Sequence, residues 1–144
     1  MNWEKWVSVR SAIFGLLILF VVWIASTYFV RLRAVGYMDS AIGSVKTLVS
    51  NEANFAKAHP SFGYSCNLAD ITSDAALISG HKDEYAFEVS DCRPHSAGEP
   101  NASYYVTARP LHADMPAYCS DQSGILKADY RGSTAACVKA GQPL

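Results

Sequence analysis

Charge is missing from one long stretch of the sequence. Residues 12–30, AIFGLLILFVVWIASTYFV, contain no charged side chain. At about 1.5 Å of rise per residue, a helix of this length just spans a bilayer core of about 30 Å. Lipid offers no partner to backbone N–H and C=O groups, so a lone segment crosses it as a continuous helix. We therefore expect a cytoplasmic flank at residues 1–11, a transmembrane anchor at 12–30 and an extracytoplasmic domain at 31–144.

A cleaved secretory signal is the alternative interpretation of this stretch. Lys5 and Arg10 form a positive start, as in signal peptides. The apolar stretch is longer than the roughly 7–15 residues of a signal core, and the bulky pair Trp23-Ile24 precedes the small residues Ala25-Ser26. We favour an uncleaved single-pass anchor in a bacterial inner membrane. The residues expected at its lipid interfaces are Trp3, Trp6, Arg10, Tyr28, Arg31 and Arg33.

Cysteine is absent from the anchor, and all four cysteines, Cys66, Cys92, Cys119 and Cys137, follow it. An even set in a small exported domain predicts two disulfides and an oxidising compartment, the periplasm or the cell surface. Four cysteines allow three pairings, of which we favour Cys66–Cys92 with Cys119–Cys137. A zinc site is the weaker alternative, because the sequence has no C-x-x-C pair. Four free thiols in a cytosolic domain are the other alternative.

Chemical signatures are also scarce. The 12 basic and 13 acidic residues nearly cancel, so no basic surface for nucleic acid is expected. The four histidines stand far apart, and the sequence lacks an H-E-x-x-H motif, a nucleophile elbow and a glycine-rich phosphate loop. We therefore predict no enzyme, no catalytic residue, no cofactor and no metal, and identify no small-molecule substrate.

The remaining pattern predicts an α+β fold. Residues 31–58 lack proline, and apolar residues recur there at steps of three and four up to His59-Pro60, which predicts an amphipathic helix. Short helical turns are expected at 67–71 and 74–79. Alternating residues predict strands at 85–90 and 103–109, and shorter ones at 116–120 and 125–130, with loops at 91–102 and 110–116. The long N-terminal helix should pack on a small four-stranded antiparallel sheet. The expected helix–sheet core contains Ile42, Val45, Val49, Phe87 and Val106.

Between about Arg31 and Tyr130 the sequence resembles a type IV pilin or a type II secretion pseudopilin. The resemblance lies in four segments: residues 41–71, which contain the end of the expected helix and the residues after it, DAALISGHKDEYAFEV at 74–89, SYYVTARP at 103–110 and AYCSDQSGILKAD at 117–129. It implies a helix whose first half is a membrane anchor and whose second half packs on a four-stranded sheet. A C-terminal disulfide loop is similar to that of pilins, and Cys119–Cys137 fits it.

The sequence departs from the pilin pattern at its N-terminus. Pilin precursors carry a glycine cleavage site directly before the apolar stretch and a glutamate at the fifth mature position. Here Gly15 lies inside the apolar stretch, and the fifth residue after it is Phe20. The resemblance therefore implies a pilin-like head on a fixed anchor, in a minor or accessory component.

Two functions follow as expectations. The first is a membrane-anchored structural or accessory protein that contacts lipid and other pilin-like or secretion-system subunits, in a bacterial type IV pilus or type II secretion-type system. The second is an anchored periplasmic ligand-binding or sensing module, because the loops at 91–102 and 110–116 could hold a ligand.

Overall fold

The computed structural model describes the backbone of residues 3–94 and 96–144, and side chains from residue 15 onwards except residue 95. It divides into two compact units, Met1–Gly36 and Tyr37–Leu144. Helix α1, Trp3–Ala58, begins in the first unit and ends in the second.

The first unit contains the uncharged part of α1, which is long and apolar enough to cross a membrane. Its side chains from Gly15 to Arg33 are exposed in the isolated chain. The hydroxyls of Ser26 and Thr27 donate to the carbonyls of Val22 and Ile24, both at 2.8 Å, so neither hydroxyl needs an outside partner. Of the expected interface residues, Tyr28, Arg31 and Arg33 are exposed. The side chains of Trp3, Trp6 and Arg10 lie outside the described residues.

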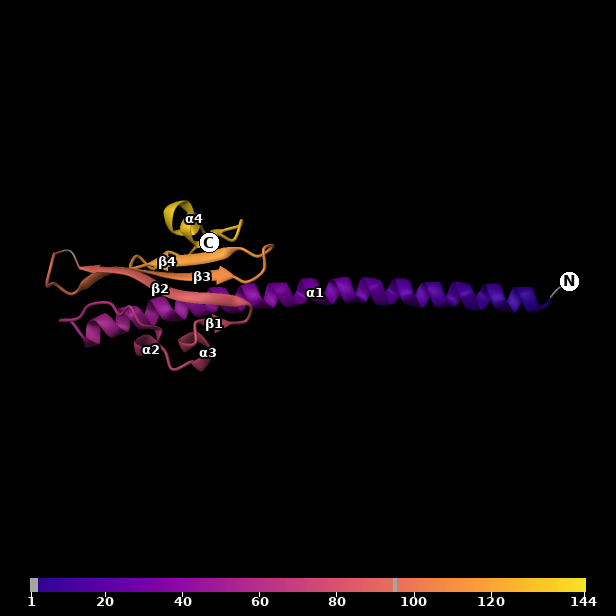
Figure 1. Ribbon diagram of the computed structural model, residues 1–144, viewed down its shortest axis with the longest axis horizontal. Helices are drawn as coiled ribbons and strands as arrows, with labels where there is room; N and C mark the ends of the chain where they lie inside the picture. Colours follow the sequence, from indigo (N-terminus) through magenta and orange to yellow (C-terminus); the bar gives the residue numbers. More distant parts are fainter. Residues whose placement is uncertain (1–2, 95) are drawn as a thin grey trace. The chain divides into compact units, whose positions relative to one another are not determined.

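The second unit is α+β, as expected, but its sheet has six antiparallel strands in the order β1 to β6 rather than four. Figure 1 shows the sheet between α1 on one face and α4 on the other, with α2 and α3 beside α1. The strands are β1 (His81–Lys82), β2 (Tyr85–Pro94), β3 (Asn101–Pro110), β4 (Ala117–Asp121), β5 (Lys127–Asp129) and β6 (Gln142–Pro143). The short helices are α2 (Leu68–Ile71), α3 (Ala75–Ile78) and α4 (Thr134–Ala140).

The core lies between α1 and the sheet. Alternate residues of β2 and β3 face it, with Phe87 opposite Ala108 and Val89 opposite Val106. Of the predicted core residues, Val45, Phe87 and Val106 are buried, while Ile42 and Val49 are partly buried against the same cluster. The period-two pattern thus correctly predicted which face of the sheet is buried.

Two local predictions need correction. The loop expected at 91–102 is shorter, because β2 continues to Pro94 past a register shift between Ser90 and Arg93, and β3 begins at Asn101. Asp91 has a φ of 53°, which fits such an irregularity. No element was expected after residue 130, but the C-terminal residues form α4 and β6. Ser133 caps α4 by accepting from the Ala136 N–H.

Candidate functional site

An open groove of about 810 Å³ lies between α1 and the connector, which we define as residues 59–80 between α1 and β1. We call it the connector groove. Amide, hydroxyl and carboxylate side chains alternate along it with a few apolar ones, so it can offer both donors and acceptors to an extended partner. Its lining residues are Thr47, Asn51, Asn54, Phe55, Ala58, Ala69, Asp70, Ile71, Thr72, Ser73 and Asp74.

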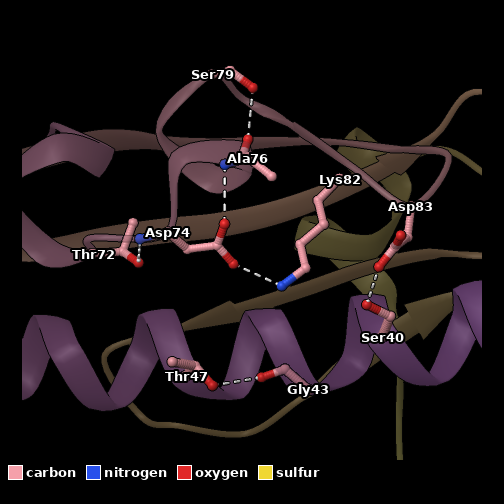
Figure 2. A network of polar contacts seen from close by, with 9 residues as sticks. All are labelled: Ser40, Gly43, Thr47, Thr72, Asp74, Ala76, Ser79, Lys82 and Asp83. Atoms are coloured by element: carbon pink, nitrogen blue, oxygen red, sulfur yellow. Dashed lines mark hydrogen bonds and ion pairs between the residues drawn. The ribbon is translucent and has the colours of Figure 1, made fainter.

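A smaller hollow of about 320 Å³ adjoins the connector groove and shares Thr47, Thr72 and Asp74 with it. Figure 2 shows the polar contacts that shape this region. Asp74 caps α3 by accepting from the Ala76 N–H at 3.0 Å, and its other oxygen accepts from Lys82 Nζ at 2.8 Å. The hydrogen bond from Lys82 is the main reason that the pKa of Asp74 is lowered. The end of the connector is therefore held by a charged pair.

The β1–β2 turn closes this end of the site against α1. Ser40 Oγ donates to Asp83 Oδ2 at 2.6 Å (Figure 2). Asp83 and Glu84 form the two-residue turn between the paired residues Lys82 and Tyr85, with φ values of 46° and 63°. Both are in the left-handed region, which glycine normally occupies in such hairpins. The turn is thus a strained element tied to the helix by one hydrogen bond.

Glu52 is the most unusual residue beside the groove. It lies on α1 with an exposed fraction of 0%, and one carboxylate oxygen, Oε2, accepts from the Ser65 N–H at 2.9 Å. The other oxygen, Oε1, has no hydrogen-bond partner among the described residues. Burial raises the pKa of Glu52 to about 7, the Ser65 N–H opposes this rise, and the negative charge of Asp70 adds to it.

Ser65 links Glu52 to the groove wall. Its hydroxyl donates to Asp70 Oδ2 at 3.0 Å and accepts from the Asn67 N–H at 3.1 Å. Asn67 in turn caps α2 by accepting from the Ala69 N–H at 3.1 Å. One residue therefore connects the buried carboxylate to the short helix that lines the connector groove.

The start of the connector is fixed by a second contact, at Gly63. Residues 62–64 bridge the first residue of β3: the Asn101 N–H donates to the Phe62 carbonyl at 2.9 Å, and the Tyr64 N–H donates to the Asn101 carbonyl at 3.1 Å. The Asn101 amide also donates to the Tyr64 carbonyl at 3.0 Å. Gly63 has a φ of 76°, and a Cβ there would lie 2.1 Å from the Asn101 carbonyl oxygen. Only glycine fits this bridge.

Both predicted disulfides are present, in the favoured pairing. Cys66–Cys92 ties the connector to β2, and Cys119–Cys137 ties β4 to α4. Cys66 is exposed, whereas Cys119 and Cys137 are 1% and 0% exposed. The first bridge is therefore a surface tether of the connector, and the second is part of a packed layer.

The described histidines stand on separate elements. His59 stacks on Phe55 with ring centroids 4.3 Å apart, His81 lies in β1, and His112 Nε2 is 3.1 Å from Glu84 Oε2. His95 lies outside the described residues. From residue 15 onwards, the described chain groups no three His, Cys, Asp or Glu side chains in a way that could hold a metal ion.

Sequence reasoning missed Glu52. A signal was present: Glu52 follows Val45 by seven residues and Leu48 by four, and both are fully buried on α1. Helical spacing alone thus placed a carboxylate on the apolar face. Ser44 is a second polar side chain of α1 that is buried, with an exposed fraction of 6%.

Comparisons with protein-family models, with curated proteins and with solved structures find no match. The molecule itself shows a long apolar N-terminal helix, an antiparallel sheet and two disulfides. This architecture is compatible with a pilin-like protein. The helix is a candidate membrane span, and the disulfides indicate an oxidising compartment for the second unit.

Proposed function

We propose that this chain is a membrane-anchored, pilin-like structural or accessory protein that acts through protein–protein contacts in a bacterial type IV pilus or type II secretion-type system. The observation that carries the proposal is helix α1. One helix, Trp3–Ala58, contains a candidate membrane span and then supplies Val45 and Leu48 to the core of a disulfide-braced α+β unit. A protein built in this way presents a folded head from a membrane.

The connector groove supports contact with other proteins. Asn51 and Asn54 on α1, and Thr72 and Ser73 on the connector, line its two sides. Their amides and hydroxyls can pair with backbone and side-chain groups of a neighbouring subunit. We propose this groove as the surface through which the head meets other pilin-like or secretion-system subunits.

Site-specific photocrosslinking in the native membrane tests the proposal. A photoreactive residue replaces Asn54 in the groove of the full-length chain, and a matched one replaces the exposed Lys139 on α4. We expect crosslinks from position 54 to subunits that have an N-terminal span and a helix–sheet head, with far weaker crosslinking from position 139. Equal labelling from both positions, together with absence of the chain from sheared filaments and from the purified secretion complex, would refute the proposal.

A second candidate function is an anchored module that binds a small ligand. The polar lining of the connector groove favours it, because Asn51, Asn54 and Thr72 offer donors and acceptors that can orient a polar ligand. A ligand that binds only the native state raises its melting temperature. A thermal-shift screen of the detergent-solubilised chain tests this candidate, and a ligand whose shift is abolished by Asn51→Ala would favour it over the subunit proposal.

A further inference from the structure

Glu52 is a buried acid without a cation. Its exposed fraction is 0%, Oε2 accepts a single hydrogen bond from the Ser65 N–H at 2.9 Å, and Oε1 has no partner among the described residues. Burial of an ionised carboxylate is costly unless it is paired and fully hydrogen-bonded. The site therefore favours the neutral acid over the carboxylate.

The ionisable groups around Glu52 include no cation among the described residues. Asp70 approaches from α2, where Ser65 Oγ donates to it at 3.0 Å, and its negative charge raises the pKa of Glu52. Tyr104 approaches from β3, where burial is the main cause that raises its pKa and the charge of Glu52 adds to this rise. The ion pairs found among the described residues do not include Glu52. On the connector side the neighbouring Cys66 is in a disulfide and does not titrate.

The contact with Glu52 is one of those that hold the connector against α1. Ser65 bonds to Glu52 by its N–H and to Asp70 by its hydroxyl, and Asp70 lies in α2 on the wall of the connector groove. Ionisation strengthens the hydrogen bond from the Ser65 N–H but leaves Oε1 charged and without a partner among the described residues, so it draws water toward Oε1. The adjacent Cys66–Cys92 bridge still ties the connector to β2, so any opening stays local.

We propose that Glu52 is a proton-operated latch on the connector: the neutral acid holds residues 64–72 against α1, and its ionisation admits water and loosens these residues while Cys66–Cys92 limits the movement. The loosened residues include the α2 wall of the connector groove, so the shape of the groove depends on pH. This inference rests on the contacts of Glu52 and does not require the proposed function.

Amide hydrogen exchange of the full-length chain in detergent micelles tests the latch between pH 5.5 and 8. The wild-type rate of each peptide is divided by that of Glu52→Gln at the same pH, which removes the intrinsic pH dependence of exchange. With a pKa near 7 in the closed state and 4.5 when exposed, the ratio for residues 64–72 should rise on the order of tenfold. Peptides from β3 and β4 should keep a constant ratio.

Two further variants keep the test decisive if Glu52→Gln folds poorly. Glu88→Gln changes an exposed carboxylate of β2 and should exchange like the wild type at every pH. Asp70→Asn removes the neighbouring negative charge, so it should shift the loosening to lower pH. The latch is overturned if the connector ratio stays flat from pH 5.5 to 8, or if β3 and β4 open equally with it.

Discussion

The connector and the C-terminal segment, residues 130–144, are both tied to the sheet by one disulfide, but they are packed in opposite ways. The C-terminal segment is dry at its tether: Cys119 and Cys137 are 1% and 0% exposed, and α4 covers β4. The connector is tethered at the exposed Cys66, and beside it a carboxylate is buried with one oxygen unpaired. A disulfide alone therefore does not decide how rigidly a segment is held.

The two segments also differ in the contacts that hold them. The C-terminal segment seats a disulfide in the interior, and its stability should depend little on pH. The connector places Ile71 and Leu77 in the core, and its start depends on hydrogen bonds through Ser65 and Asn101 and on the protonation of Glu52. Contacts around a buried acid weaken when its ionisation draws in water, so this start can open locally. We expect the connector to be the more responsive of the two.

Removal of each disulfide should give the largest change in stability and should show how the connector and the C-terminal segment differ. The sequence separations are 18 and 26 residues, so chain entropy alone gives about 3 kcal/mol for either bridge. Because Cys119 and Cys137 are buried, their joint replacement by alanine also leaves a cavity of roughly 1 kcal/mol. We expect a loss of about 4 kcal/mol from Cys119→Ala/Cys137→Ala and about 3 kcal/mol from Cys66→Ala/Cys92→Ala. Urea unfolding of the full-length chain in detergent at pH 5.5 measures both losses of unfolding free energy. A larger loss for Cys66→Ala/Cys92→Ala would contradict the conclusion that Cys119–Cys137 is the more tightly packed bridge.

The second largest effect should be a dependence of stability on pH, which we expect for the connector and not for the C-terminal segment. The pKa of Glu52 is about 7 in the folded state against 4.5 when exposed, so the native state binds more protons than the unfolded state between these values. The stability supplied by the neutral acid is complete below about pH 4.5, falls as the pH rises, and is fully lost above about pH 7. The total is about 3 kcal/mol, at about 1.4 kcal/mol per pKa unit.

Glu52→Gln isolates this contribution, because a neutral amide of similar shape replaces the acid. The difference in unfolding free energy between wild type and variant should change by about 3 kcal/mol from pH 4.5 to 8. The wild type should become less stable relative to the variant as the pH rises. Urea titrations at several pH values give this difference. A difference that is constant with pH would mean that Glu52 stays ionised in the folded protein.

Gly63→Ala should disrupt the start of the connector. An added Cβ would lie 2.1 Å from the Asn101 carbonyl oxygen, and the φ of 76° disfavours any side chain. We expect a loss of about 2 kcal/mol, since the bridge to Asn101 must open. Gly98→Ala is the matched control: its φ is 88° but no atom lies within 4 Å of the added Cβ, so only about 1 kcal/mol should be lost. Equal losses in the two variants would show that the bridge does not hold the connector.

The sequence predicted the regular parts of this molecule better than its connections. The alternation of Tyr85, Phe87 and Val89 marks a buried face directly, and His59-Pro60 marks the helix end at Ala58. The pairing of β2 with β3 beyond Ser90 depends on a register shift, and no local pattern encodes it. The position of α4 depends on a tether between residues 18 apart in sequence, so the small polar composition of its segment concealed it.

The candidate site was less predictable for a related reason. The two disulfides followed from counting cysteines, but the groove arises only when residues near 50 and near 70 meet. Glu52 could have been found from its helical spacing to Leu48, yet its burial depends on Ser65, thirteen residues later in a segment without periodicity. Tertiary contacts between a regular helix and an irregular connector are the part that sequence patterns do not describe.

The smallest expected effect concerns two turns with a positive φ. In the C-terminal segment a φ of 77° falls on Gly132, whereas in the β1–β2 turn, beyond the connector, Glu84 carries a φ of 63° with a full side chain. Glu84→Gly should therefore stabilise the protein by about 1 kcal/mol, because left-handed geometry disfavours a Cβ. The contact to His112 that is lost is solvent-exposed and contributes little. Glu88→Gly in the regular part of β2 is the control and should destabilise by about 1 kcal/mol. Thermal unfolding at pH 5.5 should move in opposite directions for the two variants, and if Glu84→Gly also destabilises, the turn is not strained.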